Sequence, residues 1–329
     1  MADNNSTLQT ISLTELLETK YEPITETVEG MLTPGLYILA GTPKVGKSFF
    51  SLQLAYALSK GEAILGKTTV QGRVLYLALE DSPQRLQSRI VGMFGRAAAS
   101  DNLDLVTNAP TIEDGLIDQL EEYAAAHTDT KLIIIDTLQM VRTASSTYKS
   151  DYEDIGALKS FADNKNVCVL LIHHTTKARK ADVFSCIAGS QGLRGAADGT
   201  LVLYRETDED NAACLSVQGR DIPTETYHLL FDQDSMQWHM DDGESFIHPA
   251  VRLIGEGLTE EDDFEFDITA SELFEKLPEL ASDGKSKLTT ITTILNKNKA
   301  ALSAHYGIEF NNLRTNKGRM LHFERHSAA

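Results

Sequence analysis

Short apolar runs alternate with stretches of helical periodicity along most of the chain. Apolar runs typical of strands lie at 36–40, 73–79, 103–106, 131–135 and 167–172. The last two are nearly continuous, as in strands buried on both faces of a parallel sheet. The intervening segments have apolar residues at helical spacing, and they predict helices over 49–58, 83–94, 112–126 and 152–163. The repeated strand–helix order predicts an α/β fold, with a mostly parallel sheet and helices on both faces.

Three further strands are predicted without long helices between them, over 200–204, 212–218 and 226–230. Strands joined by short connections are typical of antiparallel pairing. We therefore expect an antiparallel extension at one edge of the sheet.

The C-terminal part has a different pattern. An acidic stretch, 256–267, is followed by predicted helices at 271–277 and 288–298, and then by predicted strands at 310–315 and 319–325 around a turn at Asn316-Lys317-Gly318. The order helix, helix, hairpin is typical of winged-helix modules. The expected domains are a lead-in (1–30), an α/β core (31–245), an acidic linker (246–267) and a winged-helix-like α+β module (268–329).

Composition places the chain among ordinary soluble proteins, with 42% apolar and 24% charged residues. No apolar run approaches the length of a membrane span, and the first residues lack the features of a secretion signal. The three cysteines, Cys168, Cys186 and Cys214, have no metal-binding spacing. We therefore expect a cytoplasmic protein with reduced cysteines and no membrane contact.

Charge is unevenly distributed along the chain. The net charge of −18 argues against nucleic acid as a partner, but residues 284–325 hold eight Lys/Arg against two acids. Residues 255–283 hold eleven acids and one lysine. The basic segment predicts contact with duplex DNA or another acidic partner, and the alternative is a solvated face that binds nothing.

Residues 41–48 read Gly-Thr-Pro-Lys-Val-Gly-Lys-Ser, which fits the phosphate-binding pattern GxxxxGK[ST] between a predicted strand and a predicted helix. In such a loop the backbone N–H groups and the helix N-terminus surround phosphate oxygens. Lys47 would reach the β- and γ-phosphates, and the Ser48 hydroxyl would bind Mg²⁺. The expected ligands are ATP and Mg²⁺. The predicted nucleotide-binding residues are Gly41, Thr42, Pro43, Lys44, Val45, Gly46, Lys47, Ser48 and Phe49.

Two carboxylate positions complete this site in the sequence. Asp136 directly follows the strand at 131–135, where a carboxylate would hold Mg²⁺ opposite Ser48. Glu80 and Asp81 follow the strand at 73–79, and either one can act as the base for an attacking water. We favour Glu80 because its longer side chain suits contact with water, whereas Asp81 precedes a helix start and can support the cap.

Histidines and arginines near strand ends are further candidates. His173 and His174 follow the strand at 167–172, and either one is a candidate for sensing the γ-phosphate, with His173 taken as the site residue. Arg205 and Arg220 are candidates for a guanidinium that contacts the γ-phosphate, and Arg220 is favoured. The alternative for Arg220 is a surface ion pair with its neighbour, Asp221.

The motifs occur in a recognisable order over about residues 30–235. They are Pro43–Ser48, Val74–Asp81, Ile134–Leu138, His173–His174, Gly189–Ser190 with Gly192–Asp198, and Gly219–Asp221. Together they resemble the RecA-type ATPases of the hexameric helicase RepA family, which are relatives of the DnaB replicative helicases.

This resemblance implies a hexameric ring of identical chains, with ATP bound between subunits. It further implies that Glu80 is the catalytic base and that Arg220 is donated from the neighbouring subunit. Loops at 139–150 and 174–190 would face a central channel and single-stranded DNA, and the second loop carries Lys177, Arg179 and Lys180. Relatives with a paired cation place a lysine two residues before the arginine, whereas this chain has Gln218.

Three functions are consistent with these features. The first is a DNA helicase or helicase loader of a plasmid, phage or other mobile element, driven by ATP hydrolysis. The second is a DNA-binding replication initiator or regulator whose ATPase only controls assembly. The third is a nucleotide-dependent scaffold without unwinding activity.

Overall fold

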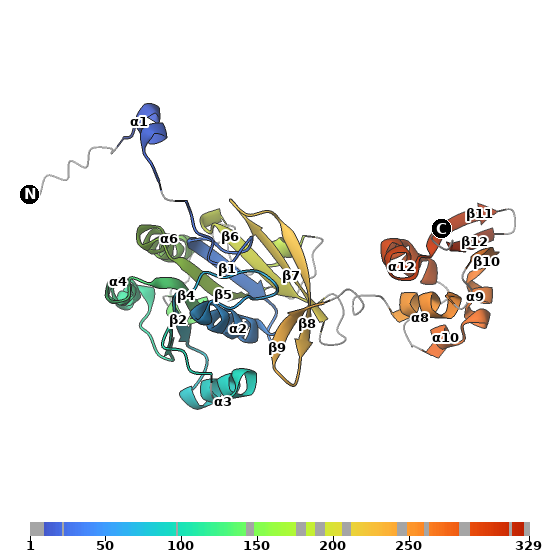
Figure 1. Cartoon of the computed structure of the whole chain (residues 1–329), viewed down its shortest axis with the longest axis horizontal. Coiled ribbons are helices and arrows are strands. Elements are labelled where there is room, and N and C mark those ends of the chain that lie inside the picture. The colour runs from blue at the N-terminus through green and yellow to red at the C-terminus, as the bar shows by residue number, and fades with distance from the viewer. Residues whose placement is uncertain are drawn as a thin grey trace, which may run out of the picture. The chain divides into compact units, whose positions relative to one another are not determined.

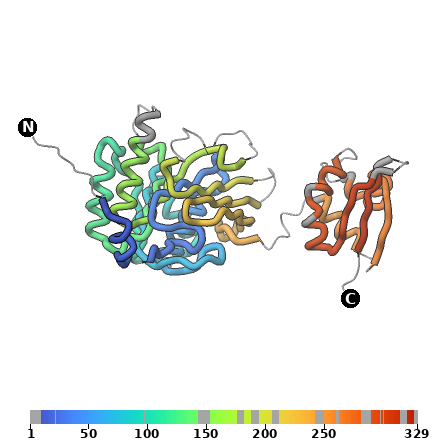
Figure 2. The backbone as a smooth tube through the Cα atoms, turned by 90° about the horizontal axis from the view of Figure 1, so that it is seen from above, coloured from blue at the N-terminus to red at the C-terminus, as the bar shows by residue number. Residues whose placement is uncertain are grey.

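The computed structural model of the chain divides into two compact units, with the main boundary between His239 and Met240 (Figure 2). Each unit has its own structure and is described by itself. No helix in the described part of the chain is long and apolar enough to cross a membrane. The described residues are 10–21, 23–96, 98–142, 148–175, 182–187, 195–205, 212–241, 249–259, 263–282, 290–315 and 318–325.

The first unit is built on a nine-stranded sheet in the order β3-β2-β4-β5-β1-β6-β7-β8-β9 (Figure 1). All the pairs from β3 to β6 are parallel, and β7 is antiparallel to β6. This confirms the mostly parallel sheet and its antiparallel extension. The strands are β1 (Gly35–Gly41), β2 (Arg73–Ala78), β3 (Leu103–Val106), β4 (Thr130–Asp136), β5 (Cys168–His174), β6 (Gly199–Tyr204), β7 (Ala212–Gly219), β8 (Glu225–Asp232) and β9 (Gln237–Met240).

Helices connect the parallel strands. Helix α3 begins as expected, with the Ser82 side chain accepting a hydrogen bond from the Arg85 N–H and a proline at the first position. The helices of this unit are α1 (Leu13–Glu18), α2 (Lys47–Lys60), α3 (Pro83–Phe94), α4 (Ile117–Ala126), α5 (Leu138–Val141) and α6 (Tyr148–Lys165), with a π-turn at Ile112–Leu116 and a 3₁₀ turn at Val183–Cys186.

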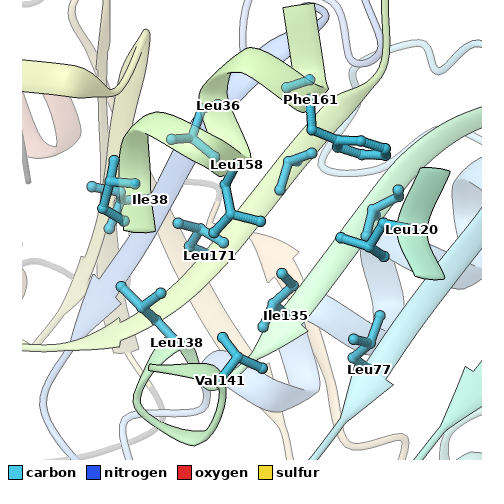
Figure 3. Close-up of a cluster of buried hydrophobic side chains, with 14 of the residues drawn as sticks. Leu36, Ile38, Leu77, Leu120, Ile135, Leu138, Val141, Leu158, Phe161 and Leu171 are labelled. Atoms are coloured by element: carbon cyan, nitrogen blue, oxygen red, sulfur yellow. The ribbon is translucent and has the colours of Figure 1, made fainter. Parts of the chain in front are cut away.

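One face of the sheet packs against α4, α5 and α6 (Figure 3). Leu158 and Phe161 of α6 lie over the strands, and Leu120 of α4 joins them. Leu36 and Ile38 of β1 belong to this cluster, so their neighbours in the strand point to the opposite face. The two-sided burial of β1 explains its continuous apolar sequence, and it fixes the position of the loop that follows.

The helix expected over 112–126 is interrupted. Asp114 and Gly115 have non-helical backbone angles, with Gly115 at a φ of 98°, and regular helix begins only at Ile117. Glycine readily adopts this positive φ. The apolar periodicity continues across the break, which is why the sequence pattern did not reveal it.

The second unit packs helices against a three-stranded antiparallel sheet in the order β10-β12-β11. Its core includes Ile254, Leu273, Leu295, Leu302 and Phe323, all with no exposed surface. Its elements are α8 (Pro249–Leu258), β10 (Phe264–Ile268), α9 (Ala270–Lys276), α10 (Glu279–Ser282), α11 (Ile291–Lys297), α12 (Lys299–Tyr306), β11 (Glu309–Thr315) and β12 (Gly318–Arg325).

Two of these elements lie in the stretch 246–267, which the sequence led us to expect to be a linker. Helix α8 contributes Ala250, Val251, Ile254 and Leu258 to the core, and β10 pairs with β12. The expectation of a linker was wrong there because acidic residues were taken as a sign of an unpacked segment. Two of these acids, Glu265 and Asp267, occupy the exposed alternate positions of the half-buried strand β10, and Glu256 lies in α8.

The N-terminal lead-in contains a short helix that the sequence did not predict. Helix α1 begins after the cap Ser12 and buries none of its residues. Several large apolar side chains here are exposed, namely Ile11, Leu13, Leu16, Leu17, Tyr21 and Ile24. The lead-in therefore carries an uncovered apolar surface.

Candidate nucleotide-binding site

The phosphate-binding loop leaves β1 at Gly41 and enters α2 at Lys47. Glycine is required at both ends of the loop. A Cβ on Gly41 would lie 2.5 Å from the carbonyl oxygen of Leu203, and Gly46 has a φ of 110°. Lys44 also has a positive φ, at 65°. This tight backbone turn at the N-terminus of a helix is the arrangement that binds anions.

Lys47 is held inside the loop. Its ammonium donates to the carbonyl oxygens of Gly41 at 2.9 Å and Thr42 at 3.1 Å, and it lies 3.4 Å from Nδ1 of His174. The residue is 6% exposed. Burial lowers the pKa of Lys47, while the negative charges of Asp136 and Glu80 oppose that change. The site therefore places a buried cation where phosphate oxygens are expected.

Asp136 ends β4 beside the loop and is 4% exposed. The hydroxyl of Tyr76 donates to its Oδ2 at 2.8 Å, and the Ser48 hydroxyl lies near enough to the carboxylate to lower its pKa against the opposing effect of burial. Ser48 and Asp136 thus present two oxygen groups side by side, which is the donor chemistry that Mg²⁺ prefers. The predicted metal-binding pair is close together in space.

Glu80 and Asp81 have different surroundings, although they are adjacent in sequence. Asp81 is largely buried and pairs with Arg89 and Arg85 of α3. Glu80 is exposed and accepts one hydrogen bond, of 3.0 Å, from the hydroxyl of Thr137. The Asp81 carboxylate is occupied by two arginines, whereas Glu80 is open to solvent, so the surroundings favour Glu80 as the residue that contacts an attacking water.

A comparison with protein families identifies the group to which this site belongs. The family model described as "AAA domain" matches residues 3–180, which is more than half of the chain. The chain belongs to the AAA domain family. A search of curated proteins found no match.

Two solved structures have the same fold as the AAA domain of this chain. One, described as an ATPase domain, has a TM-score of 0.53 and 18% identity, and the match covers 64% of this chain and 85% of that chain. "The Structure Of A DnaB-Like Replicative Helicase And Its Interactions With Primase" has a TM-score of 0.53 and 17% identity, covering 63% of this chain and 58% of that one. This part of the chain therefore has the fold of these two solved structures, one of which is described as an ATPase domain and the other as a DnaB-like replicative helicase.

Within this AAA domain, His174 is the histidine that lies beside Lys47. His173 pairs in register with Ala40, whose side chain belongs to the α6 face of the sheet. Successive residues of a strand point to opposite faces, so His174 points to the side of α2. Both histidines were candidates from the sequence, with His173 taken as the site residue. That role of His173 stays a prediction, and His174 is the one of the two that lies beside Lys47.

Arg220 follows β7 at the opposite end of the strands from the AAA phosphate loop. Its guanidinium donates to the carbonyl oxygen of Gly195 at 3.2 Å and lies 3.6 Å from Asp198. Asp198 in turn accepts from the backbone N–H of Leu36, at the start of β1. The length of β1, roughly 15–20 Å at about 3.3 Å per residue, separates Arg220 from the loop of its own chain.

The remaining predicted residues lie around the phosphate loop or in the segments that follow β5 and β6. The ring of Phe49 packs 5.2 Å from that of Phe231, and the guanidinium of Arg89 lies over it. Lys177, Arg179 and Lys180 lie outside the described residues. Arg205 follows β6 at the same end of the sheet as the phosphate loop, because Leu203 pairs with Gly41.

Replacing Asp136 with asparagine should raise the thermal midpoint of the nucleotide-free protein at pH 7. Burial raises the pKa of the Asp136 carboxyl above its ordinary value of 3.8, so holding it ionised costs stability. This cost is absent below the ordinary pKa, where the carboxyl is protonated in folded and unfolded chains alike. It grows as the pH rises through the raised folded pKa. The advantage of D136N should therefore shrink as the pH is lowered towards about 4.

Scanning calorimetry of both proteins from about pH 4 to 7 measures this difference. The asparagine can still accept the Tyr76 hydrogen bond, so the comparison isolates the charge. A D136N protein that melts below the wild type by the same margin at every pH would contradict the assigned cost.

Proposed function

We propose that this protein binds ATP with Mg²⁺ and hydrolyses it to ADP and phosphate. An assembly of identical chains uses the energy to act on DNA. A replicative helicase of a plasmid, phage or other mobile element is the activity that these features support best. One observation carries the proposal. Lys47, the Ser48–Asp136 pair and Glu80 come from three different strand ends and meet at one edge of the parallel sheet.

The residues present fit both ligands. Lys47 is buried and bonded to carbonyl oxygens of its own loop, which phosphate oxygens can replace as partners of the ammonium. Ser48 and Asp136 would hold Mg²⁺, which would neutralise charge on the phosphates. Glu80 would accept the proton from the water that attacks the γ-phosphate, and the hydroxyl of Thr137 would keep its carboxylate in place.

The direct test is release of phosphate from ATP by the full chain, measured with Mg²⁺ and with excess EDTA. We expect steady turnover that stops when EDTA removes the metal. Tight ATP binding without any turnover would leave a nucleotide-binding protein and contradict the hydrolysis. Absence of binding would contradict the nucleotide site itself.

We propose that Arg220 acts on ATP bound to a neighbouring copy. It lies at the far end of β1 from its own phosphate loop, so a contact with nucleotide requires a second chain. Its partner here is Asp198, rather than the adjacent Asp221 that sequence considerations offered as the alternative. The exposed apolar side chains around α1 supply a surface that contact between copies would cover.

Mixing two inactive variants should therefore restore activity. An Arg220→Ala chain keeps an intact phosphate loop, and a Lys47→Ala chain keeps an intact arginine, so some mixed interfaces combine both groups. ATP turnover should pass through a maximum as the mixing ratio is varied. Turnover that stays at the level of the separate variants, in samples where native mass spectrometry detects mixed oligomers, would exclude this role of Arg220.

We propose that single-stranded DNA contacts the segments 139–150 and 174–190, which were expected to be loops and which include the ends of α5, α6 and β5 and the 3₁₀ turn at Val183–Cys186. The support is the basic composition of the second loop and its position in the sequence after β5, next to His174 at the nucleotide site. A cytoplasmic location and a hexameric ring stay predictions.

A second candidate function is a DNA-binding initiator or regulator, and the second unit favours it. Its helices precede a β-hairpin, β11–β12, and an earlier strand, β10, pairs with the last strand. We propose that this is a winged-helix-like module that contacts duplex DNA, with α11 (Ile291–Lys297), which lies within the helix expected at 288–298, as the helix facing the groove. The net charge of residues 249–325 opposes DNA binding by the unit as a whole, because they hold 13 Asp/Glu and 10 Lys/Arg. A DNA-binding surface would have to be a basic patch on one part of the unit.

The affinity of the full chain for duplex DNA should fall steeply with salt if this unit binds phosphates. Each neutralised phosphate contributes about one log unit of affinity per log unit of salt. Binding of a duplex to the full chain and to a chain ending at residue 245 should be compared by fluorescence anisotropy at low and moderate salt. Equal duplex affinity of the two chains would leave the second unit with a packing role only.

A further inference from the structure

Trp238 of β9 reaches the phosphate loop from the edge strand of the sheet. Its indole Nε1–H donates to the carbonyl oxygen of Gly46 at 3.3 Å, and the side chain is 1% exposed. The ring also packs closely on this glycine, because a Cβ built on Gly46 would lie 2.7 Å from Cζ2 of the indole. Gly46 is therefore the point where the loop meets the indole.

A second contact fixes the position of Trp238 itself. The side-chain amide of Gln53 on α2 donates to the backbone oxygen of Trp238 at 2.9 Å and accepts from its backbone N–H at 2.8 Å. The two bonds tie β9 to the helix that follows the phosphate loop. Phe231 of β8 covers the indole with its ring centre 5.0 Å away, and it also contacts Phe49.

We infer that Trp238 is a positioning residue that holds the phosphate loop in its binding conformation. The inference rests on the proposed nucleotide function. Gly46 has a φ of 110°, and glycine is free to adopt several backbone conformations, so contacts with the rest of the protein select this one. The Gly46 carbonyl oxygen accepts hydrogen bonds from the Phe50 N–H of α2 and from the indole of Trp238, and the indole is the contact that comes from outside the loop and its helix. The N–H groups of this loop are the expected phosphate donors, so an ordered loop binds nucleotide more tightly than a mobile one.

A consequence is that nucleotide affinity depends on a strand 192 residues away from Gly46 in sequence. β9 is also the last strand of the large sheet, and the main boundary between the two units falls within it, after His239. No recognised motif includes this strand.

Replacing Trp238 with phenylalanine tests the inference in the full chain. Phenylalanine retains an aromatic ring and lacks the N–H donor, and a lost neutral hydrogen bond lowers affinity about three- to tenfold. We expect the Kd for MgADP, measured by calorimetry, to rise by that factor, while kcat at saturating ATP changes less than twofold. Gln53→Leu, which frees β9 from α2, should raise the Kd in the same direction.

Tyr227→Phe is the matched control, since it removes one side-chain hydrogen bond, to Glu225, from the neighbouring strand β8. Its Kd should equal that of the wild type. A folded Trp238→Phe protein that binds MgADP as tightly as the wild type would overturn the inference and leave the nucleotide function standing. A wild type that binds no nucleotide would overturn the proposed function, and this inference with it.

Intrinsic fluorescence gives a second measurement that does not depend on the variant folding. Trp238 is the only tryptophan of the chain, so its emission reports this contact directly. Titration of the wild type with MgADP should change the emission, with a midpoint equal to the Kd from calorimetry. Saturation with nucleotide and no change in emission would count against the contact.

Discussion

Lys47→Ala should abolish ATP hydrolysis while the protein remains folded. The ammonium of Lys47 is the cation buried in the phosphate loop, and removing one such contact with developing charge lowers turnover by about 10²–10³-fold. Because burial already lowers the pKa of Lys47, its charged form is costly to the fold, and alanine should not lower the thermal midpoint. Phosphate release and scanning calorimetry measure the two effects.

Lys60→Ala is the matched control for this change. Lys60 ends the same helix, about 20 Å away at 1.5 Å per residue, and its ammonium bonds a backbone oxygen outside the site. The Lys60→Ala protein should hydrolyse ATP at the wild-type rate. Near-normal turnover in folded Lys47→Ala would remove the basis for assigning the loop to ATP.

Glu80→Gln should bind ATP normally and lose hydrolysis by about 10²–10⁴-fold, because the amide has nearly the same shape but cannot accept a proton. Asp81→Asn should instead lose stability and keep most of its ATP hydrolysis. Its carboxylate is largely buried and pairs with Arg89, whose side chain is 17% exposed, so neutralising the carboxylate removes the partner of a partly buried guanidinium and lowers the thermal midpoint. Turnover at saturating ATP should then stay within the same order as the wild type.

Measuring ATP affinity, turnover and melting for both variants separates these roles. If Asp81→Asn were inactive and Glu80→Gln hydrolysed ATP, the assignment of Glu80 would be wrong and Asp81 would be the base. The two residues are adjacent in sequence, so each variant is a control for the other.

The sequence predicted the parallel part of the sheet well because its signals are local. Buried strands such as β4 and β5 are continuous apolar runs, and the phosphate loop is one contiguous motif. The same reasoning failed at β10, where alternation of Phe264, Phe266 and Ile268 with acids was taken as an acidic linker. Charge in a strand of period two indicates a solvated face rather than an unfolded segment.

The parts of the site that could not be predicted depend on contacts between distant segments. Strand alternation could have separated His173 from His174, but only the register of β5 on β1 shows which one reaches Lys47. Asp198 as the partner of Arg220 follows from the pairing of β6 with β7. Trp238 lies in a four-residue strand with no motif, so no local pattern connects it to Gly46.

The proposal that ATP hydrolysis drives action on DNA can be tested with one comparison. The ATP turnover of the full chain should be measured with and without single-stranded DNA, with the mass of the particle determined by light scattering in the presence of a non-hydrolysable ATP analogue. We expect several-fold stimulation by single-stranded DNA and a mass of several chains. Turnover unaffected by DNA at every concentration, from a particle with the 36.2 kDa mass of one chain, would contradict the proposal.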